Sequence, residues 1–233
     1  ELAVGDAGAP PPTVGHAGSP DEVPAVADPT TPPQPPRRAP RLLVVGDSTA
    51  GVTGTALQRV GASDGIAEVF VLHQPGCAVH QFDVARVRDG YLYRSPCGDI
   101  FGDALRASRQ VDPDAIVVFI GSAQLFDARY DGEQQYRSFL DPEVQRRYRE
   151  SLAGAIGRLA DAGVPVLWAD VPLPEWDLDE FAELFASPLP GSGDASSNDP
   201  ARGRQLNLVD AAVMEGQPHV RRWSYTAAIT GPD

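Results

Sequence analysis

Leu42-Leu43-Val44-Val45-Gly46-Asp47-Ser48 is the stretch that decides the fold of this chain. Its first four residues form a short apolar run that ends at Gly46, which is typical of a strand buried on both faces of a parallel sheet. Ser48 follows this strand directly and precedes a segment, Gly51–Val60, that we expect to be helical. Ligands and catalytic groups gather at the carboxyl ends of parallel strands. The sequence therefore predicts an exposed serine hydroxyl at this edge of a sheet.

Further apolar runs alternate with helical patterns along the rest of the chain. The expected strands are Val69–Leu72, Ala115–Ile120, Val164–Ala169 and a weaker Val220–Tyr225. The other expected helices are Asp99–Arg109, Asp141–Ala162 and Ala201–Met214. Alternation of this kind predicts a three-layer α/β/α fold, flavodoxin-like, with a parallel sheet of about five strands and helices on both faces.

The first 40 residues differ in composition from the rest, because eleven of the 23 prolines lie there and large apolar side chains are almost absent. Such a segment cannot bury enough surface to offset the entropy of ordering, so we expect residues 1–40 to be a disordered, Pro-rich linker. Residues 41–233 form the expected folded domain. No signal-peptide pattern is visible at Glu1–Val4. We interpret the chain as a fragment that is truncated within its last motif.

The net charge of −13 and the pI of about 4.6 oppose binding to polyanions. Nucleic-acid phosphates and anionic membrane surfaces repel such a chain, so we expect no nucleic-acid partner. No apolar run reaches the roughly 18–20 residues that a membrane-spanning helix needs.

The two cysteines, Cys77 and Cys97, lie beside turn-forming residues in Pro75-Gly76-Cys77 and Pro96-Cys97-Gly98. Two free buried thiols are one reading. A disulfide suits the turn-rich surroundings better and would stabilise the fold by roughly 3 kcal/mol in the chain-entropy model. A disulfide would also indicate an oxidising, extracytoplasmic compartment.

Four rival interpretations of the segment around Ser48 rest on the same residues. Gly46 and Gly51 have the spacing of a phosphate-binding P-loop, but Val52 stands where the lysine should be. The glycine spacing also fails the dinucleotide-binding pattern, and Asp47 excludes the G-x-S-x-G elbow of α/β-hydrolases. A purely structural reading, in which Asp47 or Ser48 caps the following helix, stays open.

An apolar strand leading into Gly46-Asp47-Ser48 resembles the first block of the SGNH/GDSL family of serine esterases and acyltransferases. Pro75-Gly76-Cys77 resembles the second block, whose glycine N–H binds the oxyanion. The Gly-Cys pair and the later cysteine are similar to the SGNH domains attached to bacterial membrane acyltransferases. The resemblance spans Arg41 to Asp233 and implies Ser48 as the nucleophile, with its own N–H and that of Gly76 as oxyanion donors.

The third and last blocks depart from this pattern. The third block should read Gly-x-Asn-Asp, but the chain has Gly121-Ser122-Ala123-Gln124, so Gln124 or Ser122 would have to replace the missing asparagine donor. Gly231-Pro232-Asp233 resembles the start of the last block, Asp-x-x-His, which places Asp233 in the aspartate position. The base histidine would fall three residues further on. Without that base we expect little esterase activity from these 233 residues.

Other residues receive lesser assignments. Among the histidines, His80 is the best replacement base, before His73 and His219, although a structural role is the simpler reading for each. Asp47 and Trp176 are expected to contact substrate. Loop carboxylates such as Asp127, Asp131 and Asp170 lack the histidine or cysteine spacing of a zinc site, so we expect no metal.

The resemblance implies hydrolysis or transfer of acyl groups, above all acetyl, on cell-envelope carbohydrate through an acyl-serine intermediate that needs no cofactor. The expected partners are an acylated carbohydrate or another small ester and an attached membrane acyltransferase domain. The expected location is extracytoplasmic, either secreted or tethered to the membrane through the linker. A non-catalytic envelope-binding module with the same fold is the alternative, and Ala123 in the third block favours it.

Overall fold

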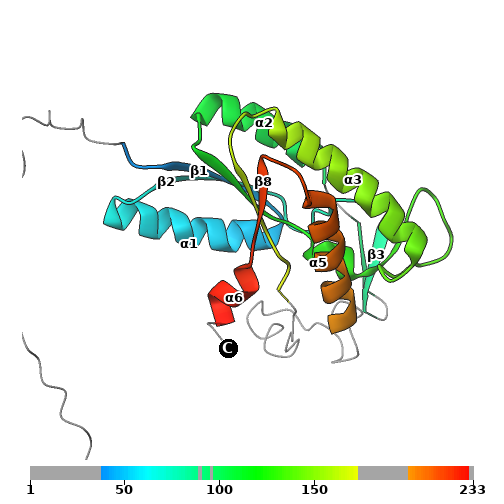
Figure 1. Ribbon diagram of the computed structural model, residues 1–233. Coiled ribbons are helices and arrows are strands. Elements are labelled where there is room, and N and C mark those ends of the chain that lie inside the picture. Colours follow the sequence, from blue (N-terminus) through cyan, green and yellow to red (C-terminus); the bar gives the residue numbers. More distant parts are fainter. Residues whose placement is uncertain (1–37, 89–90, 95–96, 173–198, 231–233) are drawn as a thin grey trace, which may run out of the picture. The chain divides into compact units, whose positions relative to one another are not determined.

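A parallel sheet forms the centre of the fold in the computed structural model, which describes residues 38–88, 91–94, 97–172 and 199–230. Within these ranges its strands pair in the order β2-β1-β5-β7-β8 (Figure 1). The strands are β1 (Arg41–Gly46), β2 (Glu68–His73), β5 (Ala115–Phe119), β7 (Val166–Ala169) and β8 (Val220–Trp223). Each lies within two residues of the expected run at either end, and the α/β prediction is confirmed.

Helices cover both faces of this sheet, as the alternating pattern predicted. They are α1 (Ser48–Asp64), α2 (Ile100–Val111), α3 (Pro142–Ala160), α5 (Pro200–Met214) and α6 (Tyr225–Thr230). Since side chains alternate along a strand, each strand supplies both faces. Leu43 and Val45 of β1 pack in the larger apolar cluster with α2, α3 and α5, whereas Val44 packs in a smaller cluster with residues of α1.

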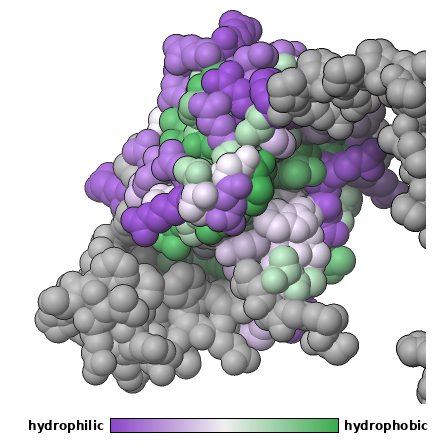
Figure 2. All heavy atoms as spheres, turned by 90° about the vertical axis from the view of Figure 1, so that its left-hand side faces the viewer, coloured by the Kyte–Doolittle hydropathy of each residue, from purple (hydrophilic) through white to green (hydrophobic). Residues whose placement is uncertain are grey.

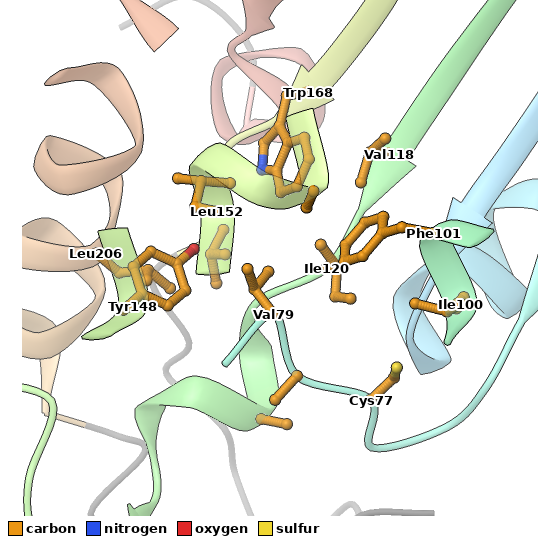
Figure 3. Packing of buried hydrophobic residues seen from close by; sticks show 14 of the residues in the cluster. Cys77, Val79, Ile100, Phe101, Val118, Ile120, Tyr148, Leu152, Trp168 and Leu206 are labelled. Carbon is orange, nitrogen blue, oxygen red and sulfur yellow. The ribbon is translucent and has the colours of Figure 1, made fainter. Parts of the chain in front are cut away.

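The larger cluster contains most of the buried aromatic side chains. Trp168 of β7 stacks on Phe101 of α2 with ring centroids 6.1 Å apart, and Tyr148 of α3 meets Phe139 edge-on. Figure 3 shows the rings of Trp168, Phe101 and Tyr148 converging with aliphatic residues from β5, α3 and α5. The burial of this apolar surface is the main force that holds three helices on one face of the sheet.

An aspartate begins each of the four longer helices. The side chains of these residues accept a hydrogen bond from a backbone N–H in the first turn, and they are Asp47 for α1, Asp99 for α2, Asp141 for α3 and Asp199 for α5. Such a cap satisfies one of the N–H groups that a helix leaves unpaired. The sequence left open a structural interpretation in which Asp47 or Ser48 caps the following helix. The structure confirms this cap for Asp47.

A second, smaller sheet was not predicted. It pairs β4 (Tyr91–Tyr93), β3 (Val84–Arg88) and β6 (Asp127–Arg129) in antiparallel fashion, in the order β4-β3-β6. These strands span three to five residues each, too few for a clear alternation in the sequence. Two of these strands, β3 and β4, lie between the two cysteines in the sequence.

Arg38, the first residue that the structure describes, contacts the residue before β5. Arg38 forms a bidentate ion pair with Asp114, both distances being 3.0 Å. On the side toward which α1 ends, hydrophilic residues are interspersed with hydrophobic ones (Figure 2). Among the described helices, none combines the length and the apolar character that crossing a membrane would require. The proposed division into a linker and a domain at residue 41 stays a prediction.

Candidate active site

Ser48 is the first residue of α1, and its side chain is exposed at the carboxyl edge of the sheet. It lies two residues beyond the end of β1, as the sequence predicted. The first N–H groups of a helix have no partner within the helix and carry a partial positive charge. An anion that forms on a group attached to Ser48 would therefore meet favourable dipoles at this point.

Gly46 allows the chain to turn from β1 into α1 close to β5. Its φ of +151° is rare for other residues, and a Cβ added there would lie 1.7 Å from the carbonyl oxygen of Phe119. That carbonyl accepts a hydrogen bond of 2.9 Å from the N–H of Asp47. Glycine is thus required where the residue before Ser48 joins the neighbouring strand.

Asp47 ties the end of β1 to the turn after β5. Its carboxylate accepts hydrogen bonds from the N–H of Thr49 (2.8 Å), the N–H of Gly121 (3.2 Å) and the hydroxyl of Ser122 (2.7 Å). Burial raises its pKa, whereas these hydrogen bonds oppose the rise. The side chain is 1% exposed and accepts three hydrogen bonds, which gives it a structural role, and its expected contact with substrate stays a prediction.

The Pro75-Gly76 turn lies at the same edge as Ser48. Gly46 and His73 are paired at the ends of β1 and β2, and the N–H of Gln74 donates to the carbonyl of Gly46 at 2.9 Å. The N–H of Cys77 then donates to the carbonyl of Gln74, which closes a tight turn. Gly76 has a φ of +72°, the left-handed conformation that such a turn favours in glycine. Parallel pairing thus places the two segments of the expected oxyanion site side by side.

Gln124, the expected substitute for the missing oxyanion donor, is engaged inside the core. It lies in a short 3₁₀ helix, Ser122–Leu125, with a fully buried side chain. Its Oε1 accepts from the N–H of His80 at 3.1 Å, and its Nε2 donates to the carbonyl of His80 at 3.2 Å. The amide therefore holds the backbone at residue 80 with both of its ends inside the core, and the oxyanion role stays a prediction. Ser122, the other candidate, donates to Asp47 and stays next to the site.

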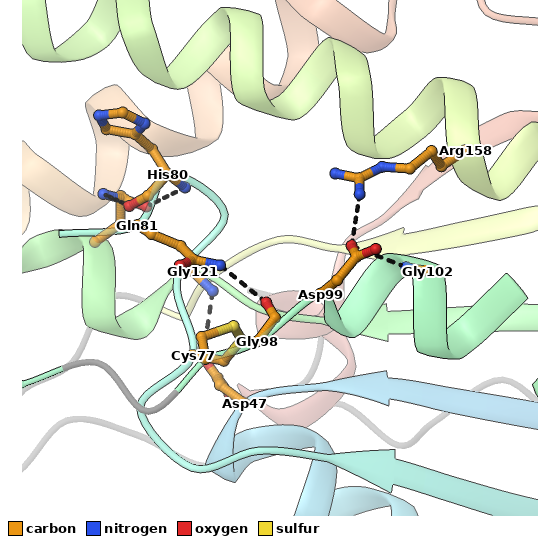
Figure 4. Close-up of a disulfide and its surroundings, with 11 residues drawn as sticks. Asp47, Cys77, His80, Gln81, Gly98, Asp99, Gly102, Gly121 and Arg158 are labelled. Atoms are coloured by element: carbon orange, nitrogen blue, oxygen red, sulfur yellow. Dashed lines mark hydrogen bonds and ion pairs between the residues drawn. A yellow bond between two sulfur atoms is a disulfide. The ribbon is translucent and has the colours of Figure 1, made fainter. Parts of the chain in front are cut away.

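The structure also reverses our ranking of the histidines. The ring of His80 stacks on Tyr130, and its Nδ1 lies 3.0 Å from the hydroxyl of Ser151 in α3. Burial lowers the pKa of His80, and Figure 4 shows the ring beside α3, away from Asp47. His73 instead packs on α1, since a Cβ on Gly51 would lie 2.6 Å from its Nδ1.

The predicted disulfide is present between Cys77 and Cys97, whose Cα atoms are 4.9 Å apart. It links the residue after Gly76 to the segment that enters α2. Around it, Gln81 donates to the carbonyl of Gly98 and Arg158 donates to Asp99 (Figure 4). These contacts surround a cavity of about 290 Å³. The disulfide thus fixes the end of the Pro75-Gly76 turn covalently to the segment that enters α2.

Several expected site residues fall elsewhere. Trp176 and Asp233 lie outside the described residues, so their assignments stay predictions. The loop carboxylates do not gather: Asp127 pairs with Arg86 and Arg202, whereas Asp131 pairs with Arg147. Asp170, at the end of β7, instead accepts hydrogen bonds from the start of α6.

Asp170 is the edge residue whose role we missed. It lines a narrow crevice of about 10 Å³ together with Asp47, Thr49 and Ser122, the residues that surround the start of α1. The signal in the sequence was the position of Asp170 directly after a buried strand. We considered this residue for metal binding alone.

Three comparisons with known proteins place this chain among its relatives by sequence and by fold. The family model for the SGNH domain that is fused to AT3 domains matches residues 16–229. A comparison with curated proteins finds no match. Among solved structures, a single-residue variant of the esterase AlinE4 is 15% identical with a TM-score of 0.44, over 83% of this chain and 79% of that one. A psychrotrophic esterase, EstA from Pseudoalteromonas sp., is 12% identical with a TM-score of 0.42, over 78% and 76%.

The match of the family model covers far more than half of the chain. This protein belongs to the family of SGNH domains fused to AT3 domains.

Proposed function

We propose that this domain is a serine esterase or O-acyltransferase that acts on acyl esters, above all acetyl esters, of cell-envelope carbohydrate. The observation that carries the proposal is the exposed Ser48 as first residue of α1, beside the Pro75-Gly76 turn. A hydroxyl at a helix N-terminus next to a tight turn has backbone N–H groups on two sides, the arrangement that stabilises an oxyanion.

The reaction would run through an acyl-serine. The Ser48 oxygen attacks the ester carbonyl carbon while a base takes its proton, and the carbonyl oxygen becomes the oxyanion. The N–H groups of Ser48 and Gly76 are the proposed donors to that oxygen. Collapse of the intermediate releases the alcohol, which regains the proton. Water or a sugar hydroxyl then attacks the acyl-Ser48 ester and completes hydrolysis or transfer.

The base is the histidine that the family pattern places three residues after Asp233, with Asp233 orienting it. Asp47 supports this chemistry indirectly, because its carboxylate fixes the backbone on both sides of Ser48. Ser122 is the remaining side-chain candidate for the third oxyanion donor. It can turn from Asp47 toward the site, since its side chain is half-buried and ends in a rotatable hydroxyl.

The setting is proposed to be extracytoplasmic. The Cys77–Cys97 disulfide suits an oxidising compartment. The family is described by its fusion to AT3 domains, so the proposed partner is an attached membrane acyltransferase that the Pro-rich segment joins to this domain.

The test is turnover of p-nitrophenyl acetate by the full-length gene product. We expect activity that falls at least about 10³-fold in Ser48→Ala, because loss of a nucleophile leaves only the binding groups. Ser63→Ala is the matched control, since it removes a hydroxyl at the exposed end of the same helix. Equal rates in wild type and Ser48→Ala would refute the proposal.

A non-catalytic carbohydrate-binding module is the second candidate, and Ala123 favours it. Ala123 is 2% exposed and has no side-chain donor, whereas the family pattern has an asparagine at this position. Loss of one oxyanion donor costs roughly 3 kcal/mol of transition-state stabilisation in other serine enzymes. A gene that lacks a histidine three codons after Asp233 would support this candidate.

A further inference from the structure

The chain from Gly76 to His80 leads from the proposed oxyanion turn into the core. The residues between them, Cys77–Val79, are at most 7% exposed. The pairing of β2 with β1 ends at His73, so other contacts hold the chain beyond the turn. The disulfide holds the first part of this segment, and the side chain of Gln124 holds its end.

Gln124 forms hydrogen bonds with both backbone groups of His80. The N–H of His80 donates to its Oε1 at 3.1 Å, and its Nε2 donates to the carbonyl of His80 at 3.2 Å. A residue in an antiparallel ladder is held by its opposite partner in the same two-bond manner. The ring of His80 also stacks on Tyr130, and its Nδ1 lies 3.0 Å from the hydroxyl of Ser151 in α3. Because the amide of Gln124 is fully buried, water cannot replace these bonds, and the backbone at residue 80 is fixed.

The turn that contains Gln124 also contacts the segment of the proposed nucleophile. The N–H of Gly121 and the hydroxyl of Ser122 both donate to the carboxylate of Asp47, and Figure 4 marks the bond from Gly121. Asp47 in turn caps α1, the helix that begins with the nucleophile. The N–H of Gln124 donates to the carbonyl of Gly121 at 2.9 Å. A single turn of chain thus joins the contacts to Asp47 with those of Gln124.

The two proposed oxyanion donors, the N–H groups of Ser48 and Gly76, lie on different segments that this turn connects. The turn is bonded to the start of α1 through Asp47 and to the segment after Gly76 through Gln124. Both N–H groups must reach one oxygen at hydrogen-bond distance. A shift of about 1 Å in either segment therefore weakens the stabilisation of the transition state.

We propose that Gln124 is a positioning residue, which holds the chain at His80 so that the N–H of Gly76 faces the same oxygen as the N–H of Ser48. This inference rests on the proposed function, because it assigns Gln124 a task in the oxyanion site of that reaction. Gln124 does not touch substrate in this proposal. It acts through the backbone of the segment that it holds.

The experiment measures kcat and KM of p-nitrophenyl acetate hydrolysis in the full-length gene product. Gln124→Ala removes both bonds to His80, so we expect kcat to fall about 30-fold with KM nearly unchanged, because a displaced donor is missed mainly in the transition state. Outright removal of an oxyanion donor costs about 10²–10³-fold, so the fall should stay below that range. Gln58→Ala is the matched control and should keep the wild-type kcat, because Gln58 donates to the carbonyl of Val69 at the opposite end of β2.

Two further variants separate positioning from folding. In Gln124→Glu, a carboxyl oxygen accepts from the N–H of His80 at any pH, but only the protonated carboxyl can donate to the carbonyl of His80. The kcat of Gln124→Glu relative to wild type should therefore rise as the pH falls from 8 to 5. Gln124→Met fills a similar space without either bond, so its kcat relative to wild type should stay low at each pH. A ratio for Gln124→Glu that does not change with pH would contradict the role of these two bonds.

The outcomes distinguish the two proposals. Wild-type turnover that does not depend on Ser48 refutes the proposed function, and this inference with it. Ser48-dependent turnover with a wild-type kcat in folded Gln124→Ala and Gln124→Met overturns the positioning role alone. An equal fall of kcat in Gln58→Ala and Gln124→Ala overturns it as well, because a general loss of stability is then the cause. If Gln124→Ala does not fold, Gln124→Met and the pH response of Gln124→Glu decide the question.

Discussion

Two aspartates are almost completely buried in the described part of this chain, and their surroundings differ. Asp47 at the carboxyl edge accepts three hydrogen bonds from two elements. Asp210 in α5 faces α3 and β7, and its Oδ1 accepts one hydrogen bond, of 2.7 Å, from the hydroxyl of Tyr148. Each side chain is 1% exposed. The two side chains are thus equally buried. They differ in the number of hydrogen-bond donors, which is three for Asp47 and one for Asp210.

The electrostatic consequence follows from that number. Burial raises the pKa of Asp210 to about 7, and the Tyr148 hydroxyl, the charge of Arg222 and the nearby Trp168 indole only partly oppose this rise. Among the described residues, Oδ2 of Asp210 and Nε1 of Trp168 form no hydrogen bond of normal geometry. A buried carboxylate with few donors is costly when charged. Asp47 at the carboxyl edge therefore holds the backbone through its hydrogen bonds. Asp210 in the core instead has a pKa near neutral pH, so its charge changes in that range.

The largest expected effect is that of Asp47→Ala. It leaves two backbone N–H groups and one hydroxyl without their acceptor, so we expect a loss of roughly 4 kcal/mol in the free energy of unfolding. Urea denaturation measures this loss. Asp199→Ala is the matched control, because Asp199 caps α5 through one backbone N–H, and we expect about 1 kcal/mol there. Equal losses would mean that the contacts to Gly121 and Ser122 contribute nothing.

Removal of the disulfide comes next. Cys77→Ala with Cys97→Ala opens a loop whose ends are 20 residues apart, so we expect a loss of roughly 3 kcal/mol. Wild-type protein in excess reductant should unfold at the same urea concentration as the double variant. A loss that appears in the variant but not on reduction would point to packing of the buried Cys77 rather than to the cross-link.

The third prediction concerns pH and Asp210. Its pKa is about 7 in the folded state and near 3.8 in the unfolded chain, so the folded state binds this proton more tightly. The stabilisation is fully present below pH 4 and is lost as pH rises through 7, and on the order of 2–3 kcal/mol of it is lost between pH 5 and pH 8. Urea denaturation of wild type and Asp210→Asn at pH 5 and pH 8 isolates this contribution. A constant difference between the two proteins would show that Asp210 does not titrate in this range.

The smallest effect is expected for Gly51→Ala. The new Cβ would meet the ring of His73 at 2.6 Å, but that ring is exposed and can move aside. Alanine also gains up to about 1 kcal/mol of helix propensity over glycine, so the net change should stay within about 0.5 kcal/mol. Gly54→Ala is the contrast, because its Cβ would meet core methyl groups of Val44 and Val71 at 3.0 Å. A loss above about 1.5 kcal/mol in Gly51→Ala would mean that the ring of His73 is held in place.

The elements of the main sheet could be predicted from the sequence because their signals are local. Val44, Val45, Val117 and Val118 lie in short apolar runs, which fit strands covered on both faces. Asp141-Pro142 marked the start of α3, since aspartate caps a helix and proline suits its first turn. The small sheet of β3, β4 and β6 has no such signal, because its short strands depend on partners distant in the sequence.

The site divides in the same way. The sequence placed Ser48 at the end of the first strand and brought Pro75-Gly76 to the same edge, because parallel strands share that edge. It assigned Gln124 to the oxyanion and Asp47 to substrate, whereas the structure engages both side chains in hydrogen bonds within the protein. Their actual partners are 44 and 74–75 residues away in the chain, apart from Thr49 beside Asp47. Residue type alone does not reveal such partners.

The sequence by itself determined the order of strands and helices, the exposed serine at the end of β1 and the pair of cysteines, because each of these follows from neighbouring residues and their spacing. The tertiary structure decided which buried carboxylate has enough hydrogen-bond donors and which histidine lies near α1. It also decided how Asp170 and Tyr225 attach α6 to the carboxyl edge of the sheet. These features depend on hydrogen bonds between elements that meet only after the sheet has formed. Packing, rather than local pattern, selects the partners.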